Sequence, residues 1–294
     1  MFKKLIVGID GAEGGADALA LARVLSADDA ELTLVGVYPR EPVAWRGASA
    51  AYQEALREEA DRILAEARKG LADSTTIVSH GAPDVGRGLH EVAARLGADV
   101  IVVGSSRKGH VGRVFTGDDT RHALNGAACA VAVAPAGYSH TEPALRKIGV
   151  GYDGSPESEQ ALAFAREIAR EKGAGVAAME VLSLPTRYLV GPAFPDRPTV
   201  LRLLDEARHR ISQIDGVEGQ AAAGVAAEEL ARFSESVDLM VLGSRGYGPV
   251  GRLVYGSVGQ DLARSARSPL LVLPRLVGEP EQAAAGSGVA NAAA

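Results

Sequence analysis

The chain carries the same strand-and-glycine pattern twice, and this duplication limits what it can fold into. A valine-rich run at residues 100–103 ends in Gly104, and a second apolar run at residues 239–242 ends in Gly243. A glycine-rich stretch of similar spacing follows each run. The flanks also match, residues 6–11 with 150–154 and residues 131–135 with 270–274. Repeats of this length have the size of a domain rather than of a solenoid unit, so the 294 residues predict two similar domains in tandem.

The composition is that of an ordinary folded protein. Hydrophobic residues make up 47% of the chain and charged residues 23%, which is enough to give each repeat a core. The net charge of −6 offers no basic footprint for nucleic acid or an anionic membrane, and no apolar run is long enough to span a bilayer. The first apolar run is too short for a signal peptide, and the single cysteine, Cys129, cannot form an intrachain disulfide. We therefore expect a cytoplasmic protein.

Short apolar runs alternate with amphipathic helical segments in both repeats, which is typical of parallel β-sheets with helical crossovers. We expect one domain over residues 1–138, a second over 146–276, and a disordered, low-complexity tail over 277–294. The first domain's expected strands are 4–9, 31–37, 75–79, 99–103 and 130–134, and its helices 12–27, 48–69, 85–96 and 117–127. The second domain's expected strands are 147–152, 175–182, 219–224, 238–242 and 269–273, and its helices 156–172, 199–215, 226–234 and 255–266.

The loop after the fourth strand of the second domain has the composition of an anion site. Gly243, Gly246 and Gly256 lie on it, and Ser257 leads into a helical pattern. Glycine lets the backbone approach an anion closely, and the free N–H groups at a helix start point toward it. Asp153 ends the first strand, so it belongs at the same edge of the sheet. An aspartate there can also simply cap the turn that follows it. Acid and glycine loop together predict a site for the phosphates of a nucleotide.

These features resemble those of the universal stress protein family, here with two domains in one chain. The family's first-strand acid with glycine occurs as Asp10-Gly11 and Asp153-Gly154, and its signature, G-x2-G-x9-G-[ST], is complete in the second domain. The resemblance spans residues 2–276. It implies an α/β fold of two tandem open five-stranded parallel sheets flanked by helices, like that of the adenine nucleotide alpha hydrolases. Domains of this family pair through their last strands, which implies an internal pseudo-dimer formed by residues 131–134 and 270–273.

The resemblance also implies a ligand. In members that bind ATP, the first-strand acid contacts the nucleoside, the second strand lines the adenine, and the glycine signature holds the phosphates. The corresponding residues here are Gly151, Tyr152, Asp153, Val181, Leu242, Gly243, Arg245, Gly246, Gly256, Ser257 and Val258. The implied cofactor is ATP, with or without Mg²⁺, and we expect no catalytic residue and no metal site built from protein ligands alone. The sequence identifies neither a protein partner nor whether two chains associate further.

The first domain departs from the signature at two positions. Arg107 replaces the second glycine and Asp118 replaces the hydroxyl residue, with Asp119 beside it. A positive φ at this position would be strained with an arginine, but the arginine could also donate hydrogen bonds to phosphate. The effect of this change on phosphate binding is therefore ambiguous. The two carboxylates repel a triphosphate at close range. We therefore expect ATP mainly in the second domain, with weak or no binding in the first.

Three kinds of function fit these observations. The first is an ATP-binding regulatory protein of the stress response, and it is the one we adopt. The second is an ATPase. Its turnover would be slow, because a P-loop and a kinase catalytic loop are both missing from the sequence. The third is a nucleotide-free scaffold of two docked domains. A dinucleotide-dependent oxidoreductase is disfavoured because neither first βα turn supplies G-x-G-x-x-G.

Overall fold

A computed structural model of the chain describes residues 1–40, 50–105, 125–183, 197–244 and 257–275. The elements of the first half are β1 (Phe2–Gly8), α1 (Glu13–Leu25), β2 (Ser26–Pro39), α2 (Ala50–Arg68), β3 (Thr76–Ala82), α3 (Val85–Leu96), β4 (Val100–Gly104) and β5 (Ala130–Ala134). A short 3-10 helix, η1 (Tyr138–His140), begins the link. The second half contains β6 (Lys147–Gly151), α5 (Pro156–Lys172), β7 (Gly175–Ser183), α6 (Arg197–Ser212), β8 (Val217–Gly224), α7 (Ala226–Phe233), η3 (Ser234–Ser236), β9 (Leu239–Gly243), α8 (Ser257–Ser265) and β10 (Leu270–Leu273).

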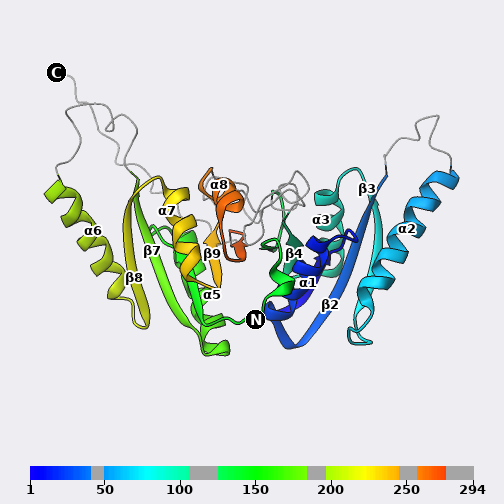
Figure 1. Ribbon diagram of the computed structural model, residues 1–294, viewed down its shortest axis with the longest axis horizontal. Helices are drawn as coiled ribbons and strands as arrows, with labels where there is room; N and C mark the ends of the chain where they lie inside the picture. The colour runs from blue at the N-terminus through cyan, green and yellow to red at the C-terminus, as the bar shows by residue number, and fades with distance from the viewer. Residues whose placement is uncertain (41–49, 106–124, 184–196, 245–256, 276–294) are drawn as a thin grey trace, which may run out of the picture.

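The strands form one sheet in the order β3-β2-β1-β4-β5-β10-β9-β6-β7-β8. Within each half all pairings are parallel, as the alternation of strands and helices predicts. The halves meet where β5 and β10 pair antiparallel, with Ala132 opposite Leu271. The expected five-stranded parallel sheet of each half is therefore confirmed, and the two join through their last strands into one ten-stranded sheet, as the internal pseudo-dimer implies. Figure 1 shows the two halves side by side.

Helices cover both faces of the sheet, because successive strand residues point to opposite sides. Leu5 and Val7 of β1 pack with α1 and α2 in one core, whose counterpart in the second half involves α5 and α6. Ile6 points the other way and packs on the face covered by α3, α7 and α8. In Figure 1, α6 and α2 lie at the outer left and right of the two halves, and α3, α7 and α8 lie nearer the centre. No helix in the described ranges combines the length and the apolar character needed to cross a bilayer.

The link between the halves is tied to the first helix by one buried carboxylate. Asp17 of α1 is only 1% exposed. Its oxygens accept hydrogen bonds from the backbone N–H of Gly137 at 2.9 Å and from the N–H and hydroxyl of Ser139, both at 2.8 Å. A buried carboxylate needs such donors to offset its lost hydration. The start of the link is thus held against α1.

Several expected element ends were wrong. The first helix, expected to reach residue 27, ends at Leu25, where the Ser26 hydroxyl donates to the Ala22 carbonyl and the backbone becomes extended. β2 therefore begins five residues earlier than expected, at Ser26 instead of 31. The expected helix 199–215 runs from Arg197 to Ser212. The expected helix 117–127 lies mostly outside the described residues, and its last three residues are not helical, with Gly126 at φ 93°. The expected tail, 277–294, lies wholly outside them.

Candidate functional site

The turn between β6 and α5 is built by a network of short polar side chains. Asp153 Oδ1 accepts from the Ser155 N–H at 3.0 Å and from the Ser155 hydroxyl at 2.5 Å. The Ser155 hydroxyl in turn accepts from the Ser158 N–H at 3.2 Å and caps α5, as serine before Pro156 predicts. Gly154 has φ 75°, which favours glycine. The turn therefore holds Asp153 in one orientation.

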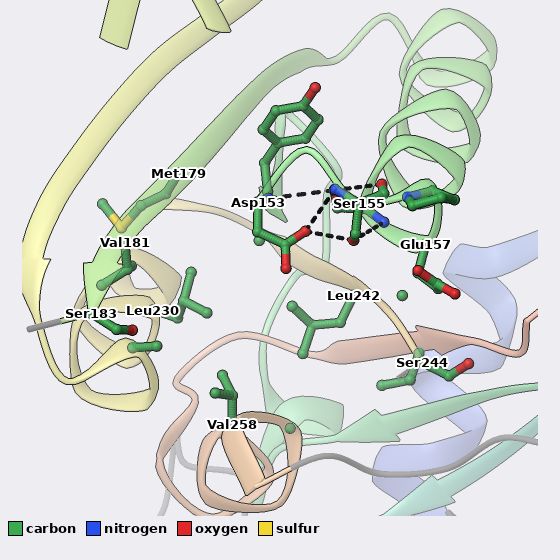
Figure 2. Close-up of a pocket in the computed structure, with 18 of the residues that line it drawn as sticks. Asp153, Ser155, Glu157, Met179, Val181, Ser183, Leu230, Leu242, Ser244 and Val258 are labelled. Atoms are coloured by element: carbon green, nitrogen blue, oxygen red, sulfur yellow. Dashed lines mark hydrogen bonds between the residues drawn. The ribbon is translucent and has the colours of Figure 1, made fainter. Parts of the chain in front are cut away.

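These hydrogen bonds also set the charge of Asp153. Burial alone raises the pKa of its carboxyl, but the hydrogen bonds from Ser155 and Ser158 favour the charged form and bring the pKa below its usual value. Figure 2 shows one carboxylate oxygen bonded to Ser155 and the other turned toward the cavity in front of Leu242. Asp153 thus presents an ionised acceptor to any ligand there, so its role in the turn and a role in binding are compatible.

A cavity of about 610 Å³ opens at the carboxyl ends of β6, β7 and β9, and its size suits a small-molecule ligand. It is the place where the sequence predicts the ligand site. The predicted residues that line it are Gly151, Tyr152, Asp153, Val181, Leu242, Gly243 and Val258. Gly151 leaves room for the Leu242 side chain, since a β-carbon at Gly151 would stand 2.7 Å from Leu242 Cδ2.

The structure does not describe the other predicted site residues in full. Arg245, Gly246 and Gly256 lie outside the described residues, as do Arg107, Asp118 and Asp119 of the first half. Ser257 begins α8, but its side chain is not described.

The cavity has an apolar side and a polar side. Met179 and Val181 of β7 and Leu230 of α7 form the apolar side, and Leu242 and Val258 extend it. Figure 2 shows Glu157 and Ser244 across the cavity from Met179 and Val181. Such a site can bury a flat apolar group at one end and meet a charged group at the other.

Tyr152 borders the cavity with its hydroxyl already engaged. The hydroxyl donates to the Glu159 carboxylate, and this bond, together with burial and the nearby negative charges, raises the pKa of Tyr152 to about 12. The phenol therefore stays protonated at any physiological pH and keeps Glu159 turned toward it.

Ser244, directly after the last glycine of β9, has a buried hydroxyl with no partner among the described residues. Its counterpart in the first half, Ser105, is in the same state. Unpaired buried hydroxyls are uncommon and often mark a place for a ligand or water. Because both halves share it, this feature belongs to the fold and does not by itself separate the halves.

The corresponding turn of the first half packs against α2. A β-carbon on Gly11 would stand 3.2 Å from Ile63 of α2, whereas one on Gly154 would meet no described atom within 4 Å. Val35, opposite Gly8 on β2, is 1% exposed, whereas Met179, in the same place on β7, lines the cavity. Among the described residues, Ile63 therefore packs against the first-half turn, whereas Met179 faces the cavity of the second half.

Sequence reasoning missed several residues that line the cavity. They are Ser155, Pro156, Glu157, Ser158, Met179, Ser183, Ala226, Leu230, Ser244, Gly259, Val272 and Arg275. A signal existed for Met179 and Ser183, because both lie two residues from Val181 and so share its face of the strand. No local pattern marks Glu157 or Arg275, which meet only because α5 packs against β9 and bonds to the segment that follows β10.

Comparisons with known proteins agree with this architecture. The family model described as the universal stress protein family matches residues 1–135 and again 144–274. A universal stress protein of Mycolicibacterium smegmatis is 28% identical over 286 residues, covering 92% of this chain and 96% of its own. A universal stress protein of Mycobacterium tuberculosis is 26% identical over 295 residues, covering 92% and 99%. The crystal structure of a universal stress protein from Archaeoglobus fulgidus superposes with a TM-score of 0.65 at 17% identity, over 93% of this chain and 97% of that one. The chain therefore belongs to the universal stress protein family, with two of its domains in tandem.

Proposed function

We propose that the second half binds an adenine nucleotide, ATP, and that the chain is a nucleotide-linked regulatory protein of the cytoplasm in the stress response. The observation that carries this proposal is the cavity in which Asp153 faces an apolar wall and Gly243 begins the glycine signature. The apolar wall suits the adenine, and the charged Asp153 carboxylate suits the ribose hydroxyls. The family often binds adenine nucleotides, which supports the same choice of ligand.

The proposal places ATP mainly in the second half. Ile63 packs over the equivalent turn of the first half, and the first-half loop carries Arg107 and Asp118 in place of a glycine and a hydroxyl residue. Within the described residues no group of three or more acidic, histidine or cysteine side chains is arranged to hold a metal. Any Mg²⁺ would therefore be held chiefly by the phosphates of the nucleotide.

Such a protein would work by binding linkage. A ligand that binds only the folded state stabilises it by RT ln(1 + [L]/Kd), which is about 2.7 kcal/mol at a hundred-fold excess over Kd. Here, the ligand would bridge the ends of β6, β7 and β9 and the start of α8. A partner that binds only this nucleotide-bound state would then bind the chain in proportion to the nucleotide concentration in the cell.

The first test is the identification and stoichiometry of small molecules released from the purified chain, followed by thermal melting with added ATP. One ATP per chain supports the proposal. The proposal is contradicted if no nucleotide is released and added ATP does not shift the melting temperature. Asp153→Ala and Gly246→Val should abolish the ATP-induced rise in melting temperature. Arg107→Ala and Asp118→Ala are the matched controls in the first half and should leave it unchanged. If only the first-half variants lost the response, the ATP site would lie in the other half.

A further inference from the structure

Arg275 stands at the polar corner of the cavity, just after the last strand. The backbone before it is held by two hydrogen bonds. The Ser244 N–H donates to the Leu273 carbonyl at 2.9 Å, and the Gln160 side chain donates to the Pro274 carbonyl at 3.2 Å. These bonds fix the origin of the Arg275 side chain beside the end of β9, where the glycine signature begins.

The Arg275 guanidinium faces the second residue of α5. Its Nε lies 3.4 Å from Glu157 Oε1, with the Arg275 side chain 37% exposed and that of Glu157 13% exposed. Both residues line the cavity. Among the described residues lining the cavity, Asp153 and Glu157 carry negative charge and Arg275 is the one cation.

This charge arrangement is unfavourable for an anionic ligand unless the arginine turns to it. A nucleotide with its base against Met179 and Val181 extends its phosphates toward the opposite side, where Glu157 and Ser244 lie (Figure 2). An unpaired carboxylate near a phosphate repels it, whereas a guanidinium can donate two parallel hydrogen bonds to phosphate oxygens.

We propose that Arg275 binds the phosphate groups of the nucleotide, and that Glu157 competes with the phosphates for its guanidinium. The inference rests on the proposed function and adds a phosphate-binding residue outside the glycine signature. The pair belongs to the second half alone, since Ala136 follows the equivalent strand-end proline in the first half and Gly14 stands in the equivalent place on α1. A simple surface ion pair would instead contribute little and would not affect a ligand.

The experiment measures the affinities of ATP, AMP and adenosine for the full chain and for Arg275→Gln and Glu157→Gln. Arg275→Gln should raise the Kd for ATP about ten-fold, the usual effect of losing a charged hydrogen bond, while leaving the Kd for adenosine unchanged. Glu157→Gln should lower the Kd for ATP, and this gain should vanish in the double variant. Arg267→Gln is the matched control, because Arg267 pairs with Glu235 at the opposite end of β10. It removes the same charge and should not alter the Kd for ATP.

The outcomes separate the two proposals. If the unmodified chain binds ATP and Arg275→Gln changes its Kd no more than Arg267→Gln does, this inference is overturned and the proposed function stands. If Arg275→Gln raises the Kd for adenosine as much as the Kd for ATP, the inference is also overturned, because the arginine then acts on the shape of the site. If the unmodified chain binds neither ATP nor adenosine, both proposals are overturned. Thermal melting without nucleotide shows whether the Arg275→Gln chain folds. If that chain does not fold, Glu157→Gln still tests the inference, because it should lower the Kd for ATP.

Discussion

The backbone of Glu157 occupies the space that a side chain on Gly243 would need. A β-carbon at Gly243 would lie 2.8 Å from Glu157 Cβ and closer still to the Glu157 carbonyl oxygen. Gly104 stands in the same relation to the carbonyl group of Gly14. The first glycine of the signature is thus required for the close packing of a helix start on a strand end, whether or not a ligand is bound.

We therefore predict that Gly243→Ala and Gly104→Ala both destabilise the nucleotide-free chain. The backbone cannot move aside as a flexible side chain can, so each should lower the free energy of unfolding by about 2 kcal/mol or more. Urea unfolding without nucleotide measures this. Gly175→Ala is the control, because among the described residues its β-carbon would come within 4 Å of nothing but the Arg146 carbonyl, at 3.8 Å. A Gly243→Ala chain of unchanged stability would show that this glycine serves the ligand alone.

The buried Asp17 carboxylate should be needed for stability. Asp17→Ala leaves three donors of Gly137 and Ser139 unpaired at the start of the link, and we expect it to cost about 2–4 kcal/mol. Chemical denaturation provides the value. Asp29→Ala removes an exposed carboxylate that lies 3.9 Å from Lys3 and should cost almost nothing. Equal stabilities of the two variants would contradict the role given to Asp17.

The apolar wall should decide the affinity for the nucleoside part of the ligand. Val181→Trp fills the cavity from β7, so we expect ATP, AMP and adenosine all to lose at least about ten-fold in affinity, because the bulk excludes the base itself. Titration calorimetry with the three ligands checks this. The pattern differs from that of Arg275→Gln, which should spare adenosine. Unaltered adenosine binding in Val181→Trp would place the base elsewhere.

The single cysteine should be unreactive in the folded chain. Burial, assisted by the negative charge of Asp99, raises the pKa of Cys129 to about 11 from the usual 9.0. Since the thiolate is the reactive form, its alkylation at mildly basic pH should be about a hundred times slower in the native chain than in urea. Because the pKa of Cys129 is higher in the folded chain than in the unfolded chain, its protonated thiol favours the folded state. This contribution to the free energy of unfolding is present below pH 9.0 and is lost as the pH rises through about 11. Similar native and unfolded alkylation rates would refute it.

The sequence by itself determined the class of fold, the duplication and much of the cavity wall. Strand and helix patterns are local, and residues such as Asp153, Val181 and Leu242 lie at strand ends that a parallel sheet must bring to one edge. The expected helix 156–172 coincides with α5, which runs from Pro156 to Lys172. Exact ends were less predictable, as at Ser26, because one hydrogen bond and the pairing of Phe2 with Ser26 override the helical pattern.

Only the tertiary structure decided how the turn after each first strand is packed and which charges face the cavity of the second half. Ile63 reaches Gly11 from a helix about fifty residues away in the chain, and Arg275 meets Glu157 across more than a hundred. Contacts of this kind depend on how helices pack against the sheet, and no spacing within the sequence records that packing. For the same reason the sequence does not reveal why Gly243 must be glycine. The Glu157 backbone lies beside Gly243 only because α5 packs against β9.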